Sequence, residues 1–183
     1  QLTTPVFGLD NQSSLCSSIN LLAGSDVLMI RRASTLTTAP GSLVASKDYI
    51  QSNFEDIILA KGVAANFTLK EIDGVTLAPI REYHQDLYYV DINNNFKRRR
   101  LINGSNTTEP LIEGVDDFQL QYGIDTNDDN IPDTFNTTPI SNDYSSWQNV
   151  KTVTVFLLIS RFFLKIAKIG IVFEAKLIIF FGL

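Results

Sequence analysis

Side chains that carry nucleophilic or metal chemistry are scarce in this sequence. Among 183 residues there is one cysteine, Cys16, and one histidine, His84. A single cysteine cannot form an internal disulfide, and a zinc site or a Cys-His nucleophile would depend on this one pair together with carboxylates. The sequence also has no glycine-rich phosphate loop, no Gly-x-Ser-x-Gly elbow and no paired-cysteine motif. These absences predict a protein that is not an enzyme, and hydrolysis that depends on His84 or Asp125 is the weakest alternative.

Basic residues are also in short supply. The chain has 15 Lys and Arg against 20 Asp and Glu, which gives a net charge of −5 and a sequence pI near 4.8. A surface that follows a phosphate backbone needs a net basic face, so no nucleic-acid partner is expected. The basic run at residues 97–100 follows three asparagines, and we interpret it as a solvated strand edge rather than a phosphate site.

Helical patterns are nearly absent before residue 156. Only residues 47–59 place apolar side chains at helical spacing, so we expect at most one short helix there. Residues 1–25 are rich in Ser, Thr, Asn and Gly and predict an irregular lead-in. A chain of this length fits one ordinary domain that buries its own core.

Strand patterns dominate the rest of the chain. In the clearest case Phe118, Leu120, Tyr122 and Ile124 alternate with more polar neighbours, which is the period of a half-buried strand. Two segments flank the Asn93-Asn94-Asn95 cluster and predict a hairpin. The predicted strands are residues 27–31, 57–59, 65–72, 87–92, 96–102, 118–124 and 150–159, the last of them central in its sheet. The fold class predicted is therefore mainly β (α+β), an antiparallel head domain over residues 1–160.

The most specific local pattern is the loop at residues 125–133. Oxygen-bearing side chains alternate at Asp125, Asn127 and Asp129, and Asp133 follows. Calcium takes six to eight oxygens from a flexible loop, and Ile131 is placed to add its backbone carbonyl. Asn130 stands at the sharpest point of the turn, where asparagine tolerates a positive φ. The predicted structural cofactor is calcium, with the ligands Asp125, Asn127, Asp129, Ile131 and Asp133.

An acidic, well solvated hairpin loop is the alternative interpretation of the same residues. Asn136 stands where an EF-hand has its bidentate glutamate, and no helical pattern flanks the loop. A calcium site would therefore need a further ligand from elsewhere, such as Asp116, Asp117 or Asp143.

Four segments follow one another in an order that indicates a family. They are PVFGLD (5–10), GSDVLMIRR (24–32), LIEGVDDFQLQYGID (111–125) and WQNVKTVTVFLLIS (147–160). The most specific part is a glycine-valine-acidic strand that leads into Tyr-Gly-x-Asp and an acidic loop. This order, over residues 5–160, resembles the PilW family of type IV pilus minor pilins.

The resemblance implies a subunit that assembles with other minor pilins and the major pilin to prime and cap a type IV pilus. It implies an inner-membrane anchor through an N-terminal apolar helix that this chain does not contain, and later a place at the cell surface, periplasmic or extracellular. Function in such proteins lies in a surface, so no catalytic residues are implied. Two alternatives remain: a type II secretion pseudopilin at the pseudopilus tip, and a calcium-dependent cell-surface adhesive module.

Residues 161–183 differ from the rest in composition, because they are apolar and basic. A membrane span, a buried pair of strands or helix, and a shifted reading frame or divergent terminus are the three interpretations. Lys165, Lys168, Glu174 and Lys176 interrupt the segment, and each charge at a bilayer centre costs about 3 kcal/mol. We therefore favour a frame error or a divergent terminus over a span, and set a boundary at residue 160.

Overall fold

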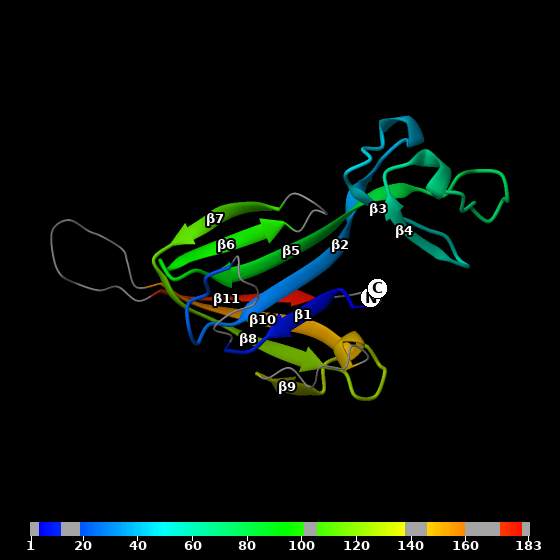
Figure 1. Ribbon diagram of the computed structural model, residues 1–183. Coiled ribbons are helices and arrows are strands. Elements are labelled where there is room, and N and C mark those ends of the chain that lie inside the picture. Colours follow the sequence, from blue (N-terminus) through cyan, green and yellow to red (C-terminus); the bar gives the residue numbers. More distant parts are fainter. Residues whose placement is uncertain (1–3, 12–18, 101–105, 138–145, 160–172, 181–183) are drawn as a thin grey trace. The chain divides into compact units, whose positions relative to one another are not determined.

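The structure is a computed structural model that describes residues 4–11, 19–100, 106–137 and 146–159, together with a strand at 173–180. The described elements are strands and three short 3-10 turns, so the predicted mainly β, antiparallel fold class is confirmed (Figure 1). The strands are β1 Val6–Leu9, β2 Val27–Thr37, β3 Asp48–Ser52, β4 Ile57–Lys61, β5 Ile80–Val90, β6 Asn95–Arg100, β7 Thr107–Glu113, β8 Val115–Ile124, β9 Thr134–Asn136, β10 Val150–Ile159 and β11 Phe173–Phe180. The 3-10 turns are η1 Pro40–Ser42, η2 Ala64–Asn66 and η3 Ser146–Asn149.

The strands form two sheets. One has the order β1-β2-β5-β3-β4, with β6 paired to β5 and β7 paired to β6, and the other has the order β11-β10-β8-β9. The described residues also divide into two compact units. Unit 1 is drawn from Gln1–Ile30, Leu87–Arg99 and Thr108–Leu183, and unit 2 from Arg31–Asp86 and Arg100–Thr107, so the long strands β2 and β5 contribute to both.

The core of unit 1 lies between its two sheets. Phe118, Leu120, Tyr122 and Ile124 of β8 are buried against side chains from β1, β2, β5 and β6, as the alternating pattern predicts. Trp147 of η3 packs edge-to-face on Tyr122, with ring centroids 5.0 Å apart. β10 supplies Val150, Val153, Val155 and Leu157 and lies between β8 and β11, so its predicted central position is confirmed.

The side of β8 that faces away from β10 is covered by three other parts of the chain. At its start, the Val115 N–H donates to the Asn94 carbonyl over 2.9 Å. In its middle, the Asp26 N–H donates to the Phe118 carbonyl and the Leu120 N–H donates to Asp26 Oδ2, both over 2.8 Å. At its end, β9 pairs with residues 122–124. Backbone groups that are bonded in this way are not available to recruit another chain.

The hairpin predicted around the three asparagines is confirmed as β5 and β6. Asn94 has φ 62°, the left-handed conformation that asparagine tolerates. The interpretation of residues 97–100 as a strand edge is wrong, however, because β6 lies between β5 and β7. The following segment, in which Pro110 removes one backbone donor, forms the edge strand β7 instead.

Unit 2 corrects two further predictions. Residues 47–59 form the hairpin of β3 and β4 rather than a helix, and residues 65–72 form η2 and a loop rather than a strand. The second correction has its reason in Gln51, because its fully buried side chain donates to the Leu69 and Ala78 carbonyls and accepts from the Leu69 N–H. The side-chain amide of Gln51 thus bonds backbone groups that a neighbouring strand would otherwise bond. Tyr49, Phe67 and Ile80 form the small core beside it.

The ends of the chain bring one correction and one new element. Residues 1–25 are not irregular throughout, because β1 pairs antiparallel with β2 from Val6↔Ile30 to Leu9↔Val27. Beyond residue 160, β11 pairs antiparallel with β10 from Ile159↔Phe173 to Thr152↔Phe180. Within the described residues, no helix is both long and apolar enough for a membrane span. The boundary at residue 160 and the origin of residues 161–183 stay predictions.

Candidate functional site

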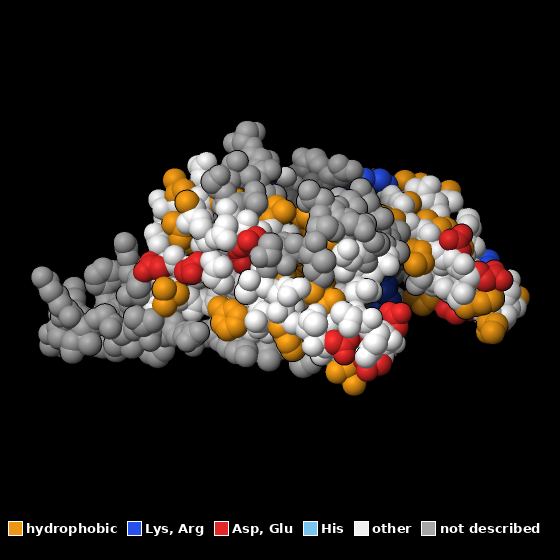
Figure 2. All heavy atoms as spheres, turned by 90° about the horizontal axis from the view of Figure 1, so that it is seen from below, with side chains coloured by type: hydrophobic (Ala, Val, Ile, Leu, Met, Phe, Trp, Pro, Cys, Tyr) orange, Lys and Arg blue, Asp and Glu red, His pale blue; other side chains and the backbone are white. Residues whose placement is uncertain are grey.

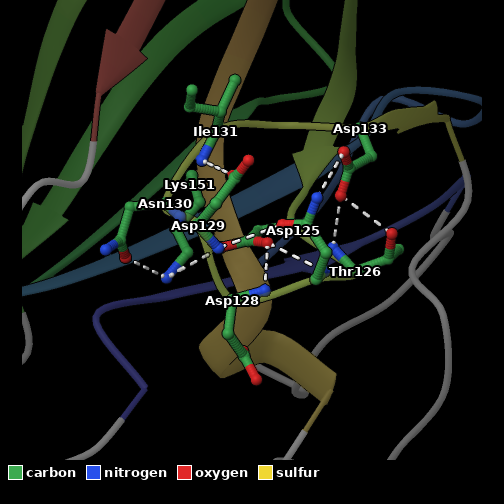
Figure 3. A network of polar contacts seen from close by, with 9 residues as sticks. Asp125, Thr126, Asp128, Asp129, Asn130, Ile131, Asp133 and Lys151 are labelled. Carbon is green, nitrogen blue, oxygen red and sulfur yellow. Dashed lines mark hydrogen bonds and ion pairs between the residues drawn. The ribbon is translucent and has the colours of Figure 1, made fainter.

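The oxygen-rich loop joins β8 to β9 and lies beside the start of β10 (Figure 3). Asp125 follows the last residue of β8, and the Asp133 N–H donates to the Ile124 carbonyl over 2.9 Å, so the two ends of the loop are held together. Asp128 and Asn130 have φ of 64° and 66°. The sharp turn predicted at Asn130 is therefore present.

Asp125 organises the loop from within. Its carboxylate is buried, and Oδ1 accepts the N–H groups of Asn127 and Asp128 over 3.1 and 2.8 Å. Oδ2 accepts the N–H of Asn130 over 2.8 Å. Burial alone would raise the pKa of Asp125, but these three donors and the charge of Lys151 outweigh it and hold the pKa below its ordinary value.

The other predicted ligands repeat this pattern. Asn127 Oδ1 accepts the Asp129 N–H, and Asp129 Oδ1 accepts the Ile131 N–H, over 3.0 and 2.8 Å. Asp133 Oδ2 accepts both the N–H and the hydroxyl of Thr126 over 2.8 Å. The structure thus brings all five predicted residues into one loop, where the side-chain oxygens of four of them bind loop donors.

Lys151 is the residue of this network that the sequence pattern did not reveal. It is the second residue of β10, and its Nζ donates to Asn130 Oδ1 over 2.9 Å and lies 3.6 Å from Asp125 Oδ2. Figure 3 shows it reaching the loop from the neighbouring strand. An ammonium group therefore already provides positive charge beside the buried carboxylate.

The additional calcium ligands predicted from the sequence are not at the loop. Asp116 accepts from Asn94 Nδ2, and Asp117 accepts from Gln119 Nε2, both near the opposite end of β8. Asp143 lies outside the described residues. In the part of the chain that the structure describes, no group of three or more His, Cys, Asp or Glu side chains is arranged to hold a metal ion. Calcium binding stays a prediction.

The catalytic alternative depends on His84 or Asp125, and it stays a prediction. His84 is half-buried on β5 in unit 2, and burial, followed by the charge of Arg100, lowers its pKa despite Glu82 Oε1 at 3.8 Å. Cys16 lies outside the described residues.

Exposed apolar side chains are concentrated in unit 2. Phe54, Ile72 and Val75 lie on its loops, with 68, 85 and 77 % of their surfaces exposed. Hydrophobic side chains also reach the surface elsewhere, close to acidic ones, as Figure 2 shows. The remaining exposed large apolar residues of unit 2 are Leu36, Val44, Ile57, Leu59 and Val63.

These features define an antiparallel β head with an ordered acidic loop and an exposed apolar surface. Residues 87–163, which run from β5 through β10, match the family model of PilW, the type IV pilus-assembly protein W. The resemblance predicted from the sequence is thereby confirmed for that part of the chain, and it indicates a role in type IV pilus assembly at the cell envelope. Comparison with curated proteins and with solved structures gave no match.

Proposed function

We propose that this chain is the head of a minor pilin that assembles with other minor pilins and the major pilin to prime and cap a type IV pilus. The observation that carries the proposal is the PilW match over residues 87–163, which includes the β5–β6 hairpin, β8, the acidic loop and β10. The protein acts by protein–protein contact and is not an enzyme. The family resemblance implies a membrane anchor through an N-terminal apolar helix, and the proposal includes that anchor.

The surface chemistry supports a role in assembly. Isolated exposed apolar residues are normal on any protein, but a concentration of them marks an interaction site. Unit 2 has eight of the thirteen large apolar residues that are exposed in the described chain. If the subunit is surrounded by neighbours after assembly, these exposed apolar residues become covered.

Deletion of the gene in its native host tests the proposal. We expect surface pili, counted by electron microscopy, to fall sharply, and to recover when the full-length gene is supplied on a plasmid. Antibody-gold labelling should place the protein at filament ends. Normal pilus numbers in the deletion strain would refute the proposal.

The two alternatives give different results in the same strain. A pseudopilin of type II secretion would leave pili intact and block export of secreted enzymes. A calcium-dependent adhesive module would leave both intact and reduce attachment only when calcium is present.

A further inference from the structure

We propose that two loops of unit 2, residues 53–56 and 70–77, form the contact surface for a neighbouring pilus-assembly protein that presents Lys or Arg beside apolar side chains. We call them the tip loops. Figure 1 shows them at the turn between β3 and β4 and in the connection between η2 and β5. The inference rests on the proposed function and specifies the surface and the partner chemistry.

The apolar part of this surface is unusually exposed. Phe54, Ile72 and Val75 come from both tip loops, and each has more than two thirds of its surface in contact with solvent. Large apolar side chains stabilise a protein when they are buried, and these three gain little of that stabilisation in the free subunit. They are suited to a surface that another protein covers.

The tip loops are also ordered before any partner binds. Asn53 Oδ1 accepts the N–H groups of Glu55 and Asp56 over 2.9 and 2.8 Å, and Asn53 Nδ2 donates to the Lys70 carbonyl over 2.8 Å. This last bond ties the two loops to each other. A preformed surface loses little conformational entropy on binding, which favours affinity.

The second loop has its own closing bonds. Asp73 Oδ1 accepts the N–H groups of Val75 and Thr76 over 2.9 and 2.8 Å, and the Glu71 N–H donates to the Thr76 carbonyl over 2.8 Å. The hydrogen bonds from Thr76 and Val75 hold the pKa of Asp73 below its ordinary value, so this carboxylate stays charged at neutral pH.

The charge of the tip loops selects the partner. The tip loops contain four acidic residues and one basic residue, so their net charge is −3. The acidic residues are Glu55, Asp56, Glu71 and Asp73, and the basic residue is Lys70. A basic protein surface complements this charge, which raises the association rate and excludes acidic partners. An anionic membrane surface would be repelled, so the exposed apolar residues do not indicate a lipid.

A second copy of this chain is less suitable than a different protein. The chain's own basic run on β6 is engaged within the subunit: Lys97 pairs with Asp91, Arg98 with Glu109 and Arg100 with Asp86. If a second copy presented its basic run to the tip loops, these ion pairs would have to break.

Photocrosslinking with the full-length protein in its native host tests the inference. A photoreactive phenylalanine is introduced at position 54 or at position 72, and crosslinked peptides are identified by mass spectrometry. We expect both positions to yield the same pilus-assembly protein, through a peptide with Lys or Arg beside apolar residues. Crosslinks to lipid only, to a second copy only, or to nothing would overturn the inference.

Charge reversal gives a matched control. Glu55→Lys should lower the crosslink yield about tenfold, the change expected when charge complementarity across an interface is lost. Glu113→Lys makes the same change of charge on unit 1 and should leave the yield unchanged. Both glutamates are exposed, and equal melting temperatures of the purified variants check that both fold. Equal yields from the two variants would contradict the inference.

The same strains separate this inference from the proposed function. If the tip-loop variant forms normal pili with undiminished crosslinks while the gene deletion removes pili, the inference fails and the proposed function stands. If the deletion itself leaves pili intact, the proposed function fails.

Discussion

Gly8 of β1 lies directly against the hydroxyl of Tyr122 on β8. A Cβ at this position would be 1.8 Å from that oxygen and 2.7 Å from the ring carbon that bears it. Tyr122 is buried in the core of unit 1 and packs on Trp147, so it has little room to move. Among the described residues, its hydroxyl has no hydrogen-bond partner.

We predict that Gly8→Ala destabilises the protein by about 1–3 kcal/mol, the usual cost of overpacking a core. Thermal and urea unfolding measure the effect. Gly41→Ala is the control, because nothing lies within 4 Å of a Cβ there. Tyr122→Phe should restore part of the loss, since it removes the nearest clashing atom, and no recovery in the double variant would contradict this explanation.

Asp26 is a buried carboxyl with a pKa raised to about 6, chiefly by burial and also by Asp10, despite hydrogen bonds from the N–H groups of Asn11 and Leu120. Because the folded pKa lies above the ordinary value of 3.8, folding takes up a proton between these two values. The contribution of Asp26 to stability is therefore largest below 3.8 and falls as the pH rises to about 6.

We predict that the difference in melting temperature between the wild type and Asp26→Asn changes between pH 3.8 and about pH 6 and is constant above that range. The wild type should lose stability relative to the variant as the pH rises. Differential scanning fluorimetry over a pH series measures the difference, with Glu113→Gln as an exposed control. Parallel curves for the wild type and Asp26→Asn would show that the carboxyl has an ordinary pKa.

The loop at residues 125–133 is where calcium can be tested. If the loop binds calcium as its sequence predicts, millimolar calcium should raise the melting temperature over that in chelator, because a ligand at 100 times its dissociation constant adds about 2.7 kcal/mol. Asp129→Asn should reduce the rise. An unchanged melting temperature would mean that the N–H groups of the loop and Lys151 stabilise it without a metal.

Lys151 and Gln51 show why the site and the rest of the fold could be predicted only in part. The alternating oxygens correctly indicated a sharp turn with a positive φ at Asn130. The partner of Asp125 comes from residue 151, and the partners of Gln51 are Leu69 and Ala78. Contacts across such sequence distances have no local signal.

At the scale of elements, β6 contains two ion pairs that differ in burial. Arg100 donates to both oxygens of Asp86 over 2.8 and 3.0 Å, and only 3 % of the Asp86 side chain is exposed. Arg98 pairs with Glu109, whose side chain is 52 % exposed. Removing one member of a buried pair leaves an unpaired charge, whereas an exposed pair contributes little.

We predict that Arg100→Leu destabilises the protein by about 3 kcal/mol and that Arg98→Leu, the matched change on the same strand, costs less than about 1 kcal/mol. Urea unfolding measures both. Asp86→Asn in the Arg100→Leu background should recover stability, because it removes the buried negative charge that Arg100 no longer offsets. Equal effects of the two arginine changes would mean that burial of Asp86 does not matter.

Strands were predicted correctly where the pattern of apolar residues in the sequence is regular. β8 and β10 alternate or run apolar over ten residues each, and both were predicted. Residues 47–59 have apolar side chains at helical spacing, yet Asn53 Oδ1 accepts the N–H groups of Glu55 and Asp56 and stops a helix there. The short strand β1 depends on pairing with β2, which no local pattern indicates.

At the scale of the whole molecule, the two units have cores of different size. Among the described residues, unit 1 buries two clusters, one of which includes β8 and β10, whereas unit 2 buries one small cluster around Tyr49, Phe67 and Ile80. Local stability follows the amount of buried apolar contact. The division itself was not predicted, because each unit is assembled from separate parts of the chain.

We therefore predict that amides of β3 and β4 exchange with deuterium faster than those of β8 and β10. Hydrogen–deuterium exchange with mass spectrometry measures the rates peptide by peptide, and unpaired loop peptides give the upper reference. Uniform protection of all four strands would mean that the two units unfold together.

The cover over the edge of β8 has a consequence for how the protein is made. The bond between Leu120 and Asp26 joins residues 94 positions apart, and the chain between them must be closed into one large loop before that edge is protected. Folds dominated by such distant contacts have high contact order and fold slowly. Until Asp26 reaches it, β8 exposes both apolar side chains and unpaired backbone, so newly made chains are at greatest risk of aggregation in this interval. We expect a dependence on chaperones that is strongest for variants at Asp26.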